Sequence, residues 1–217
     1  MVCLSAGCSK AAEPIAFQDA LTGPASPELI IPFEKYSLTP NGLLRAHSES
    51  GIENGIERPI IKTASGQYLS RDFVFEVDVT IPADHGDIAY VGFGAARSNP
   101  LQDNEPTDAF VFRIHNLPRM PFYGIDLAVA DPNGGMGYRG AFREFHRKEK
   151  YLPGETMRFQ ITRRGDAVTL SVPALPDVQA TFSIDKYRDL FDDDHSHLFL
   201  SNSSQGTTFR NMSLRIL

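Results

Sequence analysis

One stretch restricts the fold of this chain more than any other: residues 71–81, with the sequence RDFVFEVDVTI. Apolar side chains occupy every second position from Phe73 to Ile81, and Glu76 and Asp78 lie between them. This two-residue period is typical of a β-strand with one buried face and one face in water. The strand is long and rich in β-branched and aromatic residues. We therefore expect it in the middle of a sheet, because an unprotected edge of this length would pair with other chains.

Short apolar segments separated by turns follow one another along the rest of the chain. The 17 Gly and 15 Pro among 217 residues indicate many turns. A turn is predicted at residues 40–42, PNG, and a short helix at residues 185–194 with Asp185 as its N-cap. Further strands are predicted at residues 36–38, 42–46, 59–63, 87–96, 109–115, 124–130, 157–163, 167–172, 180–184, 197–200 and 208–216. About a dozen strands at a spacing of ~8–12 residues predict an all-β sandwich of two antiparallel sheets, in one domain over residues 30–217.

The N-terminus, MVCLSAGC, resembles the end of a bacterial lipoprotein signal, in which small residues precede a cysteine that becomes lipidated. This resemblance implies that residues 1–8 are a truncated signal, that Cys8 is the lipidation site and that residues 9–29 form a tether. The protein would then be exported to the bacterial cell envelope or periplasm, and would meet the membrane only through its lipid anchor. The alternative interpretation is a mobile cytosolic N-terminus. Under either interpretation, neither of the two Cys residues is available for a disulfide in the domain.

The charge balance bears on two kinds of partner. The formal charge of -6 argues against a general nucleic-acid or anionic-membrane surface, for which a basic balance is expected. A basic run at residues 139–150 contains Glu144 and Glu149, so we interpret it as a solvated loop. The alternative for this run is the lining of a groove for an anionic glycan.

Four segments together resemble the concanavalin A-like lectin and glucanase superfamily, which includes laminin G-like domains. They are residues 71–97, the strand DAFVFRIHN at 108–116, the run LPGETMRFQITRRGDAVTLSV at 152–172 and the ending SHLFLSNSSQGTTFRNMSLRIL at 196–217. The resemblance covers residues 30–217 and implies a jelly-roll sandwich. Within this group the chain is most similar to bacterial envelope domains described as 3-keto-disaccharide hydrolase-like. That similarity implies a sugar ligand on the concave sheet.

Glu76 and Asp78 are the candidate catalytic residues. They lie two positions apart on a strand, so both point to the same face with backbone positions ~7 Å apart. Two carboxyl groups at about this separation can serve an inverting glycosidase, and a closer pair suits a retaining one. The similar β-glucanases carry Glu-x-Asp-x-x-Glu on one strand, and here Ile81 stands in place of the third carboxylate. The other interpretation is a solvated strand face with Arg or Lys partners on neighbouring strands.

Arg113 and His115 share a face of another predicted strand and are candidate ligand-binding residues. An Arg with a His can bind the carboxylate of an acidic sugar or, with a Tyr, support β-elimination as in a polysaccharide lyase. Ordinary surface side chains remain the alternative. Three tyrosines could offer flat apolar faces to a sugar ring or fill the core. They are Tyr90, Tyr123 and Tyr138.

The segment DDDHSH at residues 192–197 concentrates side chains that bind metals. Its candidate ligands are Asp192, Asp194, His195 and His197. Aspartates in a loop suit Ca²⁺, whereas His-x-His on a strand suits Zn²⁺ or another transition metal. The alternative is an acidic end of a helix that runs into a strand.

Three hypotheses for function follow. The first is an exported, lectin-like carbohydrate-binding domain without catalysis, because the carboxylate motif is incomplete. The second is a glycoside hydrolase or polysaccharide lyase that acts on a glycan in the concave groove. The third is a structural or protein-interaction domain. The first hypothesis places Glu76, Asp78, Arg113, His115 and a tyrosine along one groove on the concave sheet. The three hypotheses differ in whether Glu76 and Asp78 face the same groove as Arg113 and His115.

Overall fold

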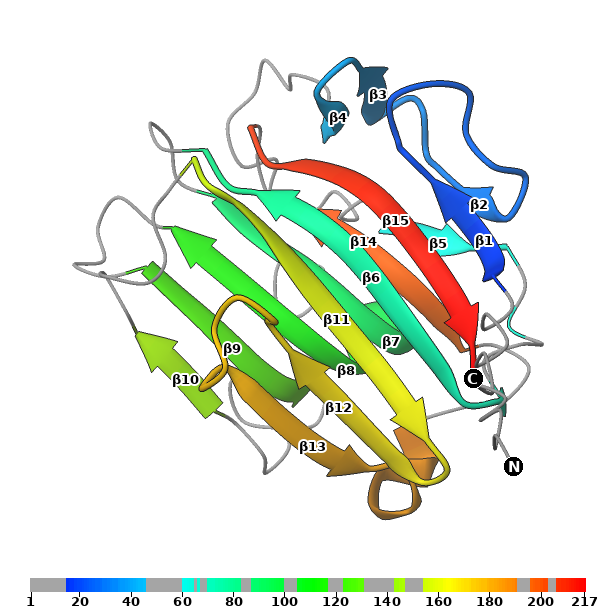
Figure 1. Cartoon of the computed structure of the whole chain (residues 1–217), viewed down its shortest axis with the longest axis vertical. Coiled ribbons are helices and arrows are strands. Elements are labelled where there is room, and N and C mark those ends of the chain that lie inside the picture. The colour runs from blue at the N-terminus through cyan, green and yellow to red at the C-terminus, as the bar shows by residue number, and fades with distance from the viewer. Residues whose placement is uncertain are drawn as a thin grey trace, which may run out of the picture.

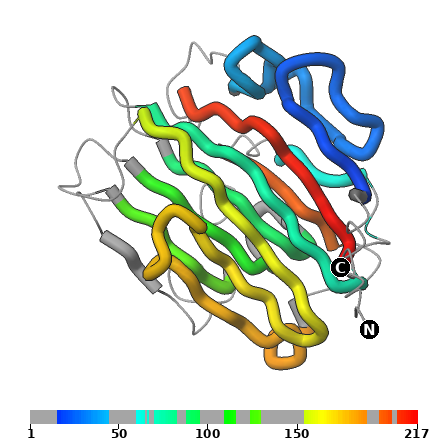
Figure 2. Tube along the Cα trace, viewed as in Figure 1, coloured from blue at the N-terminus to red at the C-terminus, as the bar shows by residue number. Residues whose placement is uncertain are grey.

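The computed structural model consists of two antiparallel sheets that pack face to face (Figure 1). It describes residues 15–45, 60–64, 66, 70–82, 87–99, 105–116, 123–130, 143–146, 154–190, 196–202 and 206–217. The prediction of an all-β sandwich is confirmed. The trace in Figure 2 shows that strands distant in sequence lie side by side, with the last strand next to the first.

The first sheet has eight strands in the order β13-β12-β11-β6-β15-β4-β3, and β1 also pairs with β15. Its strands are β1 (Ile15–Asp19), β3 (Tyr36–Thr39), β4 (Gly42–Arg45), β6 (Phe73–Thr80), β11 (Thr156–Arg164), β12 (Ala167–Ser171), β13 (Gln179–Ser183) and β15 (Thr208–Ile216). The strand predicted from residues 71–81 is β6, and it lies between β11 and β15 as expected for a central strand.

The second sheet has seven strands in the order β10-β9-β8-β7-β14-β5-β2. Its strands are β2 (Leu29–Ile30), β5 (Ile60–Thr63), β7 (Asp87–Asn99), β8 (Glu105–Asn116), β9 (Tyr123–Ala130), β10 (Arg143–His146) and β14 (His197–Asn202). The centre of this sheet is a meander of β7, β8 and β9, and β14 returns from the end of the chain to pair with β7.

Aromatic side chains from both sheets meet in the core. Phe112 of β8 packs edge to face against Phe159 of β11, with ring centroids 5.1 Å apart. Phe73 of β6 contacts Phe93 of β7 in the same way at 5.3 Å. Such contacts bury large apolar areas and add the favourable geometry of paired rings. The two sheets are therefore held at a fixed distance, and the alternating residues of each strand must point outward.

The turn predicted at residues 40–42 connects β3 and β4, and its glycine is required. Gly42 has a φ of 122°, a conformation that side chains rarely adopt. A Cβ atom at this position would also lie 2.5 Å from the carbonyl oxygen of Phe209 in β15. This glycine therefore lets the hairpin dock closely on the last strand.

The N-terminal boundary of the domain differs from the prediction. Residues 9–29 were expected to form a tether, but β1 pairs with β15 over Ile15–Asp19. Phe17 and Leu21 are buried in the core, and the carboxylate of Asp19 accepts hydrogen bonds from the backbone of Leu21 and Ser26. The tether prediction is wrong for residues 15–29, because β1 pairs with the last strand and Phe17, Leu21 and Leu29 are buried in the core. Residues 9–14 lie outside the described part.

The helix predicted over residues 185–194 is shorter and tighter than expected. The structure has a 3-10 helix, η3 (Asp185–Leu190), with Tyr187 buried against the core. Residues 191–195 are outside the described range. Within the described residues, no helix has the length and hydrophobicity needed to cross a membrane.

The position of β1 gives a first prediction. Phe17→Ala should lower the free energy of unfolding by about 3 kcal/mol, because truncation of a buried phenylalanine loses apolar burial and leaves a cavity. The exposed neighbour Gln18 provides the matched control, since Gln18→Ala should change stability by less than about 0.5 kcal/mol. Urea unfolding of both variants measures this. Equal stability of the Phe17→Ala variant and the parent would restore the tether interpretation.

Candidate functional site

The two candidate pairs lie on different sheets. Glu76 and Asp78 belong to β6 in the eight-stranded sheet, whereas Arg113 and His115 belong to β8 in the seven-stranded sheet. The residues that alternate with each pair are buried between the sheets, so each pair points away from the core on its own side of the sandwich. The expectation that all four residues line one groove is wrong.

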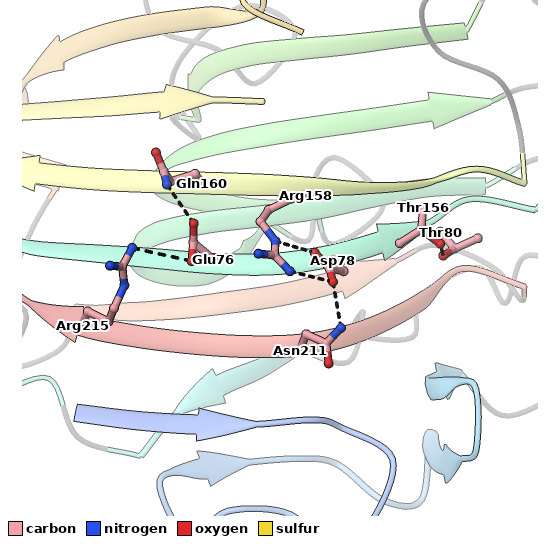
Figure 3. A network of polar contacts seen from close by, with 8 residues as sticks. All are labelled: Glu76, Asp78, Thr80, Thr156, Arg158, Gln160, Asn211 and Arg215. Carbon is pink, nitrogen blue, oxygen red and sulfur yellow. Dashed lines mark hydrogen bonds and ion pairs between the residues drawn. The ribbon is translucent and has the colours of Figure 1, made fainter. Parts of the chain in front are cut away.

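Figure 3 shows the polar network around Glu76 and Asp78 on the outer face of the eight-stranded sheet. Arg158 of β11 donates two hydrogen bonds to Asp78, from Nε to Oδ1 at 2.7 Å and from Nη2 to Oδ2 at 3.0 Å. Asn211 of β15 donates its Nδ2 to Asp78 Oδ2 at 2.8 Å. Asp78 is therefore held from both neighbouring strands.

Glu76, two residues earlier in β6, is held in a similar way. Gln160 of β11 donates its Nε2 to Glu76 Oε1 at 2.9 Å, and Nη2 of Arg215 in β15 lies 3.7 Å from Oε2. Each of the four carboxyl oxygens of Glu76 and Asp78 thus contacts a side chain on a neighbouring strand. This is the arrangement of the alternative interpretation, in which the two carboxylates link strands through cross-strand partners.

The electrostatics of Asp78 also suit a structural role. Partial burial alone would raise the pKa of Asp78, but hydrogen bonds from Arg158 and Asn211 and the charges of Arg158 and Arg210 outweigh it and lower the pKa below its usual value. A carboxyl group with a lowered pKa is ionised at neutral pH and has no proton to donate as a general acid. The network therefore gives Asp78 the properties of a fixed ion-pair partner.

The other outer face, on the seven-stranded sheet, brings Arg113 and His115 to a carboxylate. The strand register places Asp126 of β9 directly opposite Arg113 and places Gly124 opposite His115. Arg113 Nη1 lies 3.5 Å and His115 Nε2 lies 3.3 Å from the same oxygen, Asp126 Oδ2. We call Arg113, His115 and Asp126 the β8–β9 cluster.

Small residues make room for this cluster. A Cβ atom on Gly124 would lie 2.3 Å from Nε2 of His115, so the imidazole ring lies directly over the glycine. The same arrangement occurs at Gly92 of β7, where a Cβ atom would lie 2.2 Å from the Phe199 ring. This close neighbour explains the glycine inside that strand. His115 can therefore reach across β9 toward Asp126.

Burial differs sharply within the β8–β9 cluster. The side chains of Asp126 and His115 are 2% and 4% exposed, whereas that of Arg113 is 23% exposed. Among the residues that the structure describes, no donor contacts the second carboxyl oxygen, Asp126 Oδ1, which is also buried. Arg113 is thus the member of the cluster that solvent reaches, and Asp126 is a buried carboxylate with acceptor capacity left over.

Asp126 was not predicted from the sequence. It is the only charged residue in the segment YGIDLAVA of β9, and most of the other residues of this strand are apolar. The signal that could have identified it is this isolation, since a lone carboxylate in an apolar strand needs a partner. The strand register also pairs the backbone of Glu144 in β10 with Asp126, on the side opposite to Arg113.

Tyr90 shares this face but does not present its ring to a ligand. The strand register places Tyr90 of β7 directly opposite Arg113 of β8. Its side chain is only 1% exposed and belongs to a small apolar cluster of the outer face that includes Val111 and Phe199. The role predicted for Tyr90, a flat surface for a sugar, is therefore not available in this structure.

The remaining predicted site residues are only partly described. Tyr123 begins β9, but its side chain is outside the described part, as are Tyr138 and Cys8. The candidate metal ligands Asp192, Asp194 and His195 also lie outside it. His197 of β14 is described, and its Nδ1 donates to the carbonyl oxygen of Thr63 at 2.8 Å. The described residues contain no group of three potential metal ligands. Binding of Ca²⁺ or Zn²⁺ stays a prediction.

Comparison with known proteins gives matches in structure and none in sequence. No family model matches the chain, and no curated protein matches it. A Crh5 transglycosylase solved in complex with NAG superposes with a TM-score of 0.59 at 12% identity, over 94% of this chain and 86% of its own. The laminarinase catalytic domain from Thermotoga maritima MSB8 gives 0.56 at 14% identity, over 94% and 97%. The CBM2 module of the evolved Dit of Lactobacillus casei BL23 phage J-1 gives 0.56 at 11% identity, over 92% and 94%.

These neighbours are sandwiches of the same type. The chain has the concanavalin A-like jelly-roll fold. The predicted jelly-roll architecture is thereby confirmed. At 11–14% identity the comparison shows the fold alone, so the activity has to be argued from the residues of this chain.

The Asp78 network predicts a pH-dependent contribution to stability. Because the pKa of Asp78 is lowered on folding, the network stabilises the protein above the unfolded-state pKa of about 4 and loses this effect as the pH falls through the folded-state pKa. Asp78→Asn should lower the free energy of unfolding at pH 7 by about 1 kcal/mol. The deficit should shrink steadily as the pH falls below about 4.

Denaturant titrations between pH 2 and pH 7 measure this difference. Glu155→Gln, which neutralises an exposed carboxylate beside β11, is the matched control and should have little effect. A stability difference for Asp78→Asn that stays constant across this pH range would contradict the role given to the network.

Proposed function

We propose that the protein is a lectin-like carbohydrate-binding domain whose ligand contacts the outer face of the seven-stranded sheet at the β8–β9 cluster. The observation that carries the proposal is the cluster itself. Arg113, His115 and Asp126 bring charged and hydrogen-bonding groups together beside a buried apolar cluster, and Arg113 carries this charge to the surface. A few polar groups placed among apolar side chains are typical of ligand sites.

The arrangement favours Arg113 as the residue that meets the ligand. It is partly exposed, whereas Asp126, which contacts its guanidinium, and His115, which contacts the same oxygen of Asp126, are buried. A guanidinium that is held by a carboxylate loses little conformational freedom when it donates to another group. His115 and Asp126 are then positioning residues for Arg113.

The structural neighbours support a carbohydrate as the ligand. Two of them are a transglycosylase solved with NAG and a laminarinase catalytic domain, and a third is a CBM2 module. Binding without catalysis is favoured over hydrolysis by Glu76 and Asp78, because all four oxygens of that pair contact cross-strand partners. The proposal therefore keeps the fold of the neighbours without assigning their reactions.

The test is isothermal titration of the full chain with oligosaccharides, after a glycan array has selected binders. Arg113→Gln should weaken binding by at least about tenfold, since a hydrogen bond from a charged group contributes about 1.5–3 kcal/mol. Arg158→Gln, which removes an arginine from the opposite sheet, should leave the affinity unchanged. Thermal unfolding establishes that both variants are folded. Absence of binding to any glycan at millimolar concentration would contradict the proposal.

We also propose that the protein is exported and anchored at the bacterial cell envelope through Cys8. Support comes from the small residues before this cysteine and the polar sequence after it. Metabolic labelling of cells that express the natural gene with an alkyne fatty acid should label the protein, and Cys8→Ser should abolish the label. Cys3→Ser is the matched control. Unlabelled protein in the cytosolic fraction would contradict anchoring.

A further inference from the structure

We infer that the β8–β9 cluster selects neutral sugars over acidic ones, with Asp126 Oδ1 accepting a hydrogen bond from a ligand hydroxyl group. This inference rests on the proposed carbohydrate binding and specifies its ligand class. It replaces the expectation from the sequence that Arg113 and His115 bind the carboxylate of an acidic sugar.

The first argument is the unequal use of the two oxygens of Asp126. Both contacts of the cluster, from Arg113 Nη1 and His115 Nε2, converge on Oδ2. The other oxygen, Oδ1, is buried and receives no hydrogen bond from the described residues. A buried acceptor without a donor is unfavourable by about 1–3 kcal/mol, and more for an ionised group. A donor supplied by a ligand would remove this cost.

The second argument is charge. Arg113 is already matched by Asp126, whose carboxylate lies within 3.5 Å of the guanidinium. A ligand carboxylate that bound Arg113 would therefore approach a carboxylate that is poorly screened by solvent. A hydroxyl group carries no charge and meets no such repulsion.

The third argument is the order of donor and acceptor along the face. Arg113 and Asp126 occupy directly opposite positions of neighbouring strands, so a strong donor and a strong acceptor stand side by side. Two adjacent hydroxyl groups of a sugar match this arrangement, because one can accept from Arg113 while the other donates to Asp126. The ligand class that fits is a neutral sugar with a pair of neighbouring hydroxyl groups.

The burial of Asp126 sets a condition on binding. Because its side chain is 2% exposed, a ligand can reach Oδ1 only if neighbouring atoms move aside.

The experiment compares matched neutral and acidic ligands on the full chain. Gluco-oligosaccharides and the corresponding oligoglucuronates, which differ in one oxidised carbon per unit, are titrated into the wild-type protein by calorimetry. We expect the neutral series to bind at least tenfold more tightly. Asp126→Asn should shift the ratio of neutral to acidic affinity by at least tenfold toward the acidic series. Asp78→Asn, on the opposite sheet, should not change the ratio.

Each outcome separates this inference from the proposed function. Tighter binding of the acidic series, or a wild-type affinity ratio that Asp126→Asn leaves unchanged, would overturn the inference while carbohydrate binding stands. An Oδ1 that is occupied by ordered water and makes no ligand contact, seen in a crystal structure with bound oligosaccharide, would also overturn it. Failure of both series and of every other glycan to bind would overturn the proposed function itself. If Asp126→Asn does not fold, the wild-type comparison alone decides.

Discussion

The packing of two aromatic-rich inner faces is the constraint on which the rest of this structure depends. Phe73 and Phe159 of one sheet contact Phe93 and Phe112 of the other, and these contacts fix which side of every strand points inward. In a strand the remaining side chains then have to point outward. The polar residues that alternate with the buried ones therefore lie on two separate outer faces, one on each sheet. The two faces carry different sets of charged and hydrogen-bonding groups.

The two faces use polar residues differently. On the eight-stranded sheet, each carboxyl oxygen of Glu76 and Asp78 contacts a side chain of a neighbouring strand. On the seven-stranded sheet, Asp126 keeps one buried oxygen without a donor among the described residues. A satisfied network stabilises and specifies a sheet, whereas an incomplete one has capacity for a ligand. This contrast is why we assign function to the second face.

The sequence predicted local geometry well and long-range pairing poorly. The two-residue period of β6 and β8 was enough to show that Glu76 shares a face with Asp78, and Arg113 with His115. Separation of the two pairs onto different sheets depends on strand order, which is set by pairings between distant segments such as β6 with β15. Asp126 was not predicted because its pairing with Arg113 depends on the register between β8 and β9, which the sequence does not specify.

The most direct test of the account is to map the ligand surface by NMR during a titration with a neutral oligosaccharide. We predict that the backbone amide signals of β8 and β9 around Arg113 and Asp126 change with ligand concentration, while those of β6 and β11 around Asp78 and Arg158 do not. Changes confined to the Asp78 and Arg158 face would contradict the central claim that the ligand binds at the β8–β9 cluster.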